Sequence, residues 1–147
     1  MSGDAGDLIR AAIRVGRTCH EDGLLRLVTR CWTGTLWLTF DARSVVFRFD
    51  LGDLVDVVEC QNDLKHDEGH FGFSASATSW RQVLLARASS DSNGGSTAWV
   101  SDIVRTGHRG TYWQYHRAAG RLFDLLGEEL DARRNSWSRT KSFSRSS

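Results

Sequence analysis

Proline is absent from this sequence, and cysteine occurs only three times. The cysteines, Cys19, Cys31 and Cys60, are odd in number and too widely spaced for a zinc site or a Cys-x-x-Cys redox motif. They therefore predict free thiols in a reduced cytoplasm. The absence of proline carries no functional inference.

Long apolar segments are also missing. The longest uncharged runs, residues 31–40 and 71–80, have about ten residues, well short of the ~20 that span a bilayer as a helix. The N-terminus is acidic at Asp4 and has no apolar signal core. We therefore expect a soluble, cytoplasmic protein without a transmembrane segment.

The common catalytic motifs are not present. The sequence has no Gly-x-Ser-x-Gly elbow, no phosphate-binding loop and no dinucleotide fingerprint. Asp53, Asp56 and Glu59 are spaced by three along a predicted strand, so their carboxylates alternate between its faces and do not converge. The sequence therefore predicts no catalytic residue and no cofactor.

One pair of histidines has a spacing that a metal could use. His66 and His70 lie four apart with Asp67 and Glu68 between them, but Gly69 interrupts the helix that this spacing needs. No third ligand is evident nearby, so we expect a solvated loop and no metal site. The remaining histidines fit surface or helix-capping positions: His20, His108 and His116.

Charge divides the chain into two parts. Residues 1–131 carry 14 basic and 18 acidic groups, whereas the following segment has five basic groups and no acid. We predict a single α+β domain over residues 1–131 and a disordered, basic Ser/Arg-rich tail over 132–147. An acidic domain with a basic tail argues against nucleic-acid binding by the whole protein.

Residues 35–75 alternate apolar and polar side chains, which is typical of strands with one buried face. Strands are predicted at 35–40, 45–50, 54–60 and 70–75, with short connections that favour antiparallel neighbours. The inward positions on three of them are Leu36, Leu38, Phe40, Val45, Phe47, Phe49, Phe71 and Phe73.

Helical periodicity surrounds this sheet. Asp7 could cap a first helix that ends near Gly16, and a second apolar stripe covers residues 24–32. Thr78 or Ser79 could cap a helix carrying Trp80. A short helix is predicted near 99–107, and a closing helix covers 112–126 and ends at 127 or 131.

These elements predict an α+β fold in which several helices cover one face of a mostly antiparallel sheet of four to five strands. Six tryptophans and seven phenylalanines could wall an apolar cavity between the two layers. The residues expected to line it are Leu38, Phe40, Phe47, Phe49, Phe71, Phe73, Trp80, Leu84, Trp99, Ile103 and Trp113.

A family resemblance lies in residues 71–80, FGFSASATSW, where a strand of alternating apolar residues runs into a helix with Trp80, and in the VLLA that follows at 83–86. This passage, with the glycine segment 106–110 and the closing helix, resembles the sterol carrier protein type two family, the non-specific lipid-transfer proteins. The likeness covers roughly residues 24–130. It implies an α+β fold with an apolar tunnel and no catalytic residues. The family's final strand has no clear counterpart, and the Gly94-Gly95 loop differs from its usual connection.

The leading hypothesis is a non-catalytic module that binds or transfers a fatty acyl or sterol ligand, with transient membrane contact as an option. Two alternatives remain open at this point. A small enzyme of the cyclase or isomerase type would need a buried, convergent histidine or carboxylate. A domain that binds a protein partner would need a large exposed apolar patch without a cavity.

Overall fold

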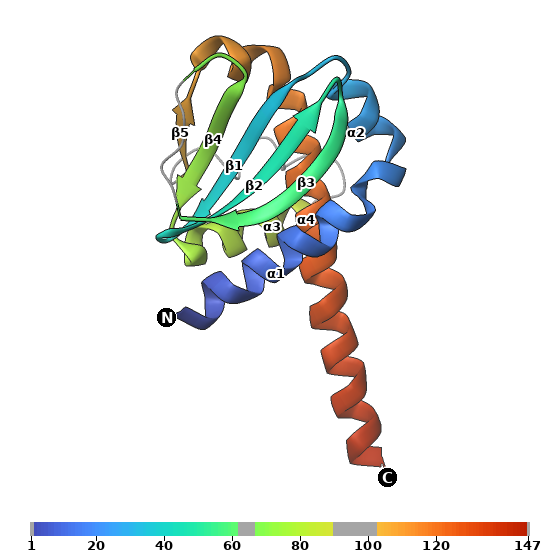
Figure 1. Cartoon of the computed structure of the whole chain (residues 1–147). Helices are drawn as coiled ribbons and strands as arrows, with labels where there is room; N and C mark the ends of the chain where they lie inside the picture. The colour runs from blue at the N-terminus through green and yellow to red at the C-terminus, as the bar shows by residue number, and fades with distance from the viewer. Residues whose placement is uncertain (1, 62–66, 90–102, 147) are drawn as a thin grey trace.

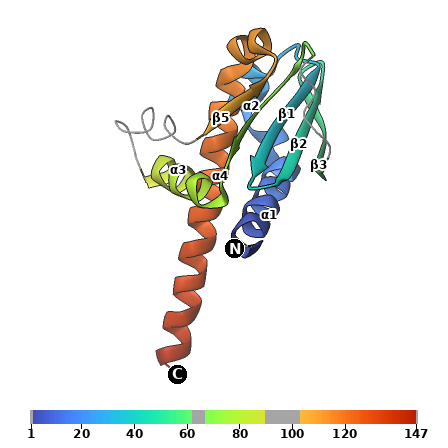
Figure 2. The ribbon, with the colours of Figure 1, turned by 90° about the vertical axis from the view of Figure 1, so that its left-hand side faces the viewer.

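The computed structural model, which describes residues 2–61, 67–89 and 103–146, has one five-stranded sheet and four α-helices (Figure 1). Figure 2 shows α3 and α4 on one side of the sheet. This arrangement confirms the predicted α+β class with a mostly antiparallel sheet. In chain order, the elements are α1 (Ser2–Thr18), η1 (Cys19–Glu21), α2 (Gly23–Val28), β1 (Gly34–Phe40), β2 (Arg43–Asp50), β3 (Asp53–Cys60), β4 (His70–Ala75), α3 (Ala77–Ser89), β5 (Val104–Gly107) and α4 (Arg109–Ser146).

The strand order is β3-β2-β1-β4-β5, and β1 pairs in parallel with β4 while all other neighbours are antiparallel. The expectation that β4 would follow β3 as an antiparallel neighbour is therefore wrong. In the observed pairing, Leu36 of β1 lies opposite Phe47 on one side and Phe71 on the other. The register thus places β1, with its fully buried Leu36, Leu38 and Phe40, at the centre of the sheet between two strands that also carry buried phenylalanines.

The predicted strand bounds and buried faces are confirmed for the first four strands. Each observed strand begins within two residues of its predicted start and ends at the predicted residue. All inward positions predicted for β1, β2 and β4 are buried, at 0–3% exposure: Leu36, Leu38, Phe40, Val45, Phe47, Phe49, Phe71 and Phe73. Strict alternation was therefore sufficient to orient these strands.

The α1 helix begins at Ser2, ahead of the predicted cap at Asp7, and continues through Gly16 to Thr18. Gly16 does not end the helix. It lies where α1 packs closely against the sheet. A Cβ at this position would lie 2.3 Å from Cγ2 of Val57 on β3. Glycine thus allows the helix to approach the sheet more closely than alanine would.

The second helix is shorter than its apolar stripe predicts. The α2 helix ends at Val28, and Trp32 lies in the extended segment that leads to β1. The Trp32 indole is buried, donates a 3.1 Å hydrogen bond from Nε1 to the Gly69 carbonyl oxygen, and stacks on Phe49 with ring centroids 4.6 Å apart. The Trp32 side chain therefore packs in the core and is not part of a helix face.

The cap of α3 is Ser76, just before the predicted Thr78 or Ser79. The Ser76 hydroxyl oxygen accepts a 3.1 Å hydrogen bond from the Ser79 backbone N–H. Asp41, in the β1–β2 turn, accepts a second one of 3.1 Å from the Ala77 N–H. These two side chains satisfy backbone donors at the helix start, as capping requires.

The segment predicted as a helix at 99–107 lies partly outside the described residues, and Trp99 is among those not described. The described part is extended: Val104–Gly107 forms β5 at the edge of the sheet, with Phe73 opposite Arg105. The helical prediction is therefore wrong for this part. The final strand that had no clear counterpart in the sequence is present here.

The closing helix α4 is longer than predicted. Its start is capped by His108, whose Nδ1 accepts a 3.1 Å hydrogen bond from the Thr111 N–H. Gly127 does not end it, because this glycine lies at the crossing with α3, where a Cβ would be 2.4 Å from the Leu84 carbonyl oxygen. Residues 132–146, whose composition predicts disorder, continue the helix and project away from the sheet (Figure 1).

We predict that this projecting segment is dispensable for folding of the domain. Deleting residues 133–147 should leave the melting temperature unchanged, because the buried part of α4 ends at Leu130 among the residues whose side chains are described. Differential scanning calorimetry of the full chain and the truncated chain checks this. A drop above ~4 °C, roughly 1 kcal/mol or more for a domain of this size, would show that the segment is docked.

Candidate functional site

The structure gathers most of the predicted cavity residues in the core between the sheet and the helices. Eight of them are buried and belong to one cluster: Leu38, Phe40, Phe47, Phe49, Phe71, Phe73, Trp80 and Leu84. The predicted convergence of these side chains is thus observed. Room for a ligand among these side chains depends on the free space between them.

Aromatic rings fill much of that space. The Phe123 ring of α4 lies 5.2 Å, centroid to centroid, from Trp80 of α3 and 5.2 Å from Phe73 of β4, in edge-to-face geometry. Trp80 and Phe40 are 5.3 Å apart in the same geometry. Centroid distances of ~4.5–7 Å are those of rings in direct contact. This part of the molecule is therefore a packed core.

The other predicted residues lie at its margin or outside it. Ile103 is partly buried and packs against the core. Trp113 is 59% exposed and lies on the surface of α4, so it lines no interior space. The Arg105 side chain of β5 packs over the rings of Tyr112 and Trp113. Its guanidinium carbon lies 4.2 Å from the Tyr112 ring centroid and 5.8 Å from the Trp113 ring centroid.

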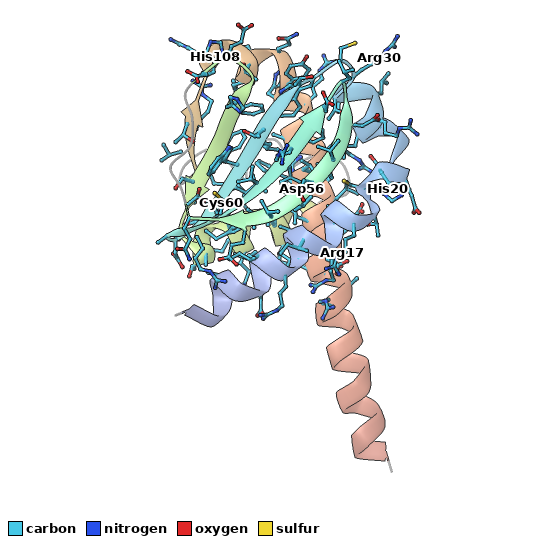
Figure 3. The ribbon with its side chains drawn as sticks, in the orientation of Figure 1. Arg17, His20, Arg30, Asp56, Cys60 and His108 are labelled. Carbon is cyan, nitrogen blue, oxygen red and sulfur yellow. The ribbon has the colours of Figure 1, made fainter. Side chains whose placement is uncertain are left out.

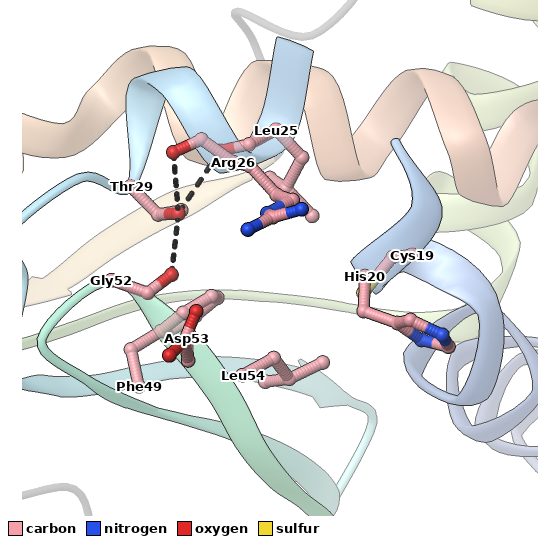
Figure 4. Close-up of a pocket in the computed structure, with 9 residues that line it drawn as sticks. All are labelled: Cys19, His20, Leu25, Arg26, Thr29, Phe49, Gly52, Asp53 and Leu54. Carbon is pink, nitrogen blue, oxygen red and sulfur yellow. Dashed lines mark hydrogen bonds between the residues drawn. The ribbon is translucent and has the colours of Figure 1, made fainter. Parts of the chain in front are cut away.

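A cavity of about 300 Å³ lies at one end of the sheet, between the η1–α2 segment and the turn that joins β2 to β3 (Figure 4). Its apolar wall includes Leu25, Phe49 and Leu54, and its polar groups include Arg26 and Asp53. The remaining lining residues are Cys19, His20, Thr29 and Gly52. Of the predicted residues that the structure describes, only Phe49 contributes to this cavity.

The turn between β2 and β3 shapes one side of the cavity. Leu51 and Gly52 both have positive φ, 50° and 89°, as the central residues of a tight type I′ hairpin turn do. The Gly52 N–H donates a 2.8 Å hydrogen bond to the Trp32 carbonyl oxygen. The Thr29 hydroxyl lies 2.9 Å from the Gly52 carbonyl oxygen and thereby links the turn to the end of α2.

Asp22 fixes the other side of the cavity, where α2 begins. Its carboxylate accepts a 2.8 Å hydrogen bond from the Leu25 N–H, which caps the helix. It also accepts two bonds, of 2.9 Å and 2.7 Å, from Arg121 of α4. The Arg121 guanidinium holds the pKa of the Asp22 carboxyl below its usual range. The Arg121 side chain is therefore partly buried in an ion pair.

Replacing Asp22 by alanine should lower the free energy of unfolding by about 2–3 kcal/mol, because a helix cap and a charge-assisted pair are both lost. Asp22→Asn keeps the capping oxygen and should cost less. The depressed pKa means that the carboxylate stabilises the fold above the unfolded-state pKa and loses this effect as pH falls through the folded-state value. Urea unfolding should therefore show wild type more stable than Asp22→Asn at neutral pH, and the difference should begin to shrink as the pH falls below about 4, the usual pKa of a free aspartate; a difference that stays constant from pH 7 to pH 2 would contradict this.

The side chains around the cavity favour binding over covalent chemistry. Burial raises the pKa of the Cys19 thiol to about 11, so the thiol is protonated at neutral pH and is a poor nucleophile. His20 of η1 lines the cavity with a side chain that is 65% exposed to solvent, and Arg30 lies at the surface beyond the end of α2 (Figure 3). In the described part of the chain, no three His, Cys, Asp or Glu side chains gather into a possible metal cluster, and His66 lies outside that part.

Three leucines stand exposed beside the cavity. Leu24 and Leu27 of α2 are 53% and 61% exposed, and Leu51 at the tip of the turn is 76% exposed. Leu27 and Leu51 line a second, more open depression that shares Arg26, Gly52 and Asp53 with the first. Large apolar side chains that gather at one exposed end make this end of the molecule a candidate binding surface.

Sequence reasoning missed this surface, although a signal was present. Leu24, Leu25 and Leu27 all fall within four residues, and a short helix cannot bury side chains on every side. The structure buries Leu25 and leaves the other two exposed. The segment holds more leucines than one buried face of a short helix can take. This excess could therefore have predicted that some of them are exposed and form an apolar site.

The arrangement of helices and sheet is that of the sterol carrier protein type two fold. A crystal structure of sterol carrier protein 2 superposes with a TM-score of 0.58 at 18% identity, covering 83% of this chain and 95% of that chain. A solution structure of a conserved hypothetical protein from Thermus thermophilus, for which a sterol carrier role is suggested, gives 0.59 at 18%, covering 82% and 86%. The predicted resemblance is thus confirmed for the fold.

No protein-family model matches the sequence, and no curated protein matches it significantly. Among the described residues, no helix is both long and apolar enough to cross a membrane.

Proposed function

We propose that the protein binds an apolar ligand of the fatty acyl or sterol class, without catalysis, in the cavity between α2 and the β2–β3 turn. The observation that carries this proposal is the cavity itself, whose walls include Leu25, Phe49 and Leu54. The sterol carrier fold supports it, because a structure with the same arrangement is of a protein named for carrying sterols.

The size of the cavity sets the expected mode of binding. A volume of about 300 Å³ is at the lower end of the ~300–1,000 Å³ of small-molecule pockets. It fits part of an acyl chain better than a whole sterol. Apolar transfer contributes ~25 cal/mol per Å², and association costs remove much of this. We expect micromolar affinity and little discrimination between head groups.

A longer ligand would have to extend toward the core. The cavity ends at Phe49, whose ring stacks on Trp32, and Trp32 in turn lies 5.5 Å from the Phe71 ring. Displacement of the Trp32 ring would connect the cavity with the predicted lining at Phe71 and Phe73. Trp32 is then the reporter of binding, because its emission responds to a ligand that contacts or displaces it.

The exposed leucines favour delivery from an apolar surface. Leu24, Leu27 and Leu51 surround the cavity at the same end of the protein, and Arg26 and Arg30 lie among them. Apolar side chains flanked by arginines suit transient contact with a membrane. The same residues also favour the second candidate function, in which this end binds a protein partner.

Titration of the purified protein tests the proposal, after native mass spectrometry has established whether a lipid co-purifies. Palmitoyl and cholesterol probes at up to ~100 μM should quench tryptophan emission. Leu54→Trp should fill the cavity and weaken binding about tenfold. The matched control is Val55→Trp, since Val55 is the next residue on β3 and its side chain is exposed; its binding should equal that of wild type.

Two results would contradict the proposal. If neither probe binds the folded protein and no lipid co-purifies, the partner-binding alternative takes first place. If both probes bind but Leu54→Trp and Val55→Trp behave alike, an apolar ligand binds elsewhere in the molecule.

A further inference from the structure

Another hollow lies where α1, α3 and α4 meet and each contacts the other two. Its volume is about 340 Å³. Four of its lining residues are arginines, Arg10 and Arg14 from α1, Arg81 from α3 and Arg133 from α4. We call this hollow the arginine groove. It shares no residue with the apolar cavity.

Two carboxylates contact these four guanidinium groups. Asp7 pairs with Arg10 and lies 3.6 Å from an Arg81 nitrogen. A single oxygen of Glu129 lies 2.6 Å from Arg14 Nε and 3.5 Å from Arg133 Nε. Among the described side chains at this hollow, guanidinium groups therefore outnumber carboxylates. This excess of positive charge favours a further anion.

The groove combines this charge with apolar surface. Leu85 of α3 and Leu130 of α4 complete its lining. The Arg14 and Arg81 side chains are partly buried, so solvent and salt screen them less than surface charges. The groove thus offers guanidinium donors, an excess of positive charge and an apolar wall within one small space.

We propose that the arginine groove binds a phosphate monoester carried by a molecule with an apolar portion. A phosphate monoester has a charge of about −1.5 to −2 at neutral pH and three acceptor oxygens, so it can interact with several guanidinium groups at once. Guanidinium groups bind phosphate oxygens bidentately, a fork geometry that lysine lacks. The apolar portion of the ligand lies against Leu85 and Leu130. This inference does not depend on the apolar cavity.

Isothermal titration calorimetry of the full chain at constant ionic strength tests the proposal with three probes. Glycerol 3-phosphate supplies the phosphate monoester alone, glycerol lacks it, and 1-acylglycerol 3-phosphate adds an acyl chain. We expect glycerol 3-phosphate to bind at or below about 1 mM and glycerol not to bind. The acyl derivative should bind more tightly, since it covers the apolar wall.

Two double variants with the same change in net charge provide the control. Arg10→Ala with Arg133→Ala removes two groove arginines whose side chains are 63% and 62% exposed, so the fold should survive. Arg17→Ala with Arg117→Ala also removes one exposed arginine from α1 and one from α4, but outside the groove. Glycerol 3-phosphate should bind the first variant at least tenfold more weakly, and the second within twofold of wild type.

The proposal is overturned if glycerol 3-phosphate gives no binding heat up to ~5 mM, five times the weakest affinity expected. It is equally overturned if the two double variants lose affinity to the same extent, since the effect would then be one of overall charge. Leu54→Trp should not change the binding of glycerol 3-phosphate. This variant therefore separates a failure of the groove from a failure of the apolar cavity.

Discussion

Replacing Phe71 by alanine is expected to lower the free energy of unfolding by about 3–5 kcal/mol. The Phe71 side chain is fully buried on β4, beside Leu36 of β1. Its ring contacts Trp32, Phe73 and Tyr112, with centroids 5.5 to 6.0 Å away. Truncation to alanine removes these contacts and leaves a cavity, because the surrounding sheet cannot move inward to fill the space. Urea unfolding followed by tryptophan emission measures the loss.

Val58→Ala is the control, because Val58 also lies on the sheet but is largely exposed on β3. It should cost less than about 1 kcal/mol. Phe47→Ala should behave like Phe71→Ala, since Phe47 lies opposite Leu36 on the other side of β1. A loss below ~1 kcal/mol at both Phe47 and Phe71 would mean that this face of the sheet is not the core.

A second large effect is expected for Gly34→Ala at the start of β1. A Cβ at this position would lie 1.8 Å from the Gly69 carbonyl oxygen and 2.7 Å from Trp32 Nε1. That oxygen accepts hydrogen bonds from Trp32 Nε1 and from the Thr35 N–H. Because a backbone atom cannot rotate away, we expect a loss of about 3 kcal/mol, the upper end of the usual cost of overpacking.

Gly23→Ala is the matched control for this substitution. Gly23 is the first residue of α2, and a Cβ there would meet no atom within 4 Å. Alanine at this position should be neutral or stabilise the protein by up to about 1 kcal/mol, because it restricts the unfolded chain. Thermal unfolding of both variants gives the comparison. Equal stability of Gly34→Ala and wild type would contradict the close approach of residues 34 and 69.

The strands of the sheet could be predicted from the sequence because the residue pattern of each strand lies within one short, continuous segment. In β2, Val45, Phe47 and Phe49 alternate with other residues over one short stretch, and this pattern fixes both the element and its buried face. The helices were harder to bound. Gly16 and Gly127 look like helix ends in the sequence, but each is needed for a contact with a distant element. Their role depends on packing that local patterns do not encode.

The candidate site was predictable only in part for the same reason. Phe49 belongs to the predicted set and lines this cavity, but the cavity lies elsewhere than predicted, and its other walls come from α2, η1, the β2–β3 turn and the start of β3. Their positions depend on the Asp22–Arg121 pair, which joins residues 99 apart, and on the link from Thr29 to Gly52. Seven of the other predicted residues belong to the packed core, because α3 and α4 bring Trp80 and Phe123 into direct contact above the sheet.

The parallel pairing of β1 with β4 has a consequence for the order of folding during synthesis. The β1–β2–β3 meander pairs neighbours in sequence and can form as soon as it emerges, because its loops close quickly. Until residues 70–75 follow, the second edge of β1 remains unpaired beside Leu36, Leu38 and Phe40. An unpaired edge next to an apolar face promotes aggregation. Nascent chains that stop before β4 should therefore be the species that chaperones hold.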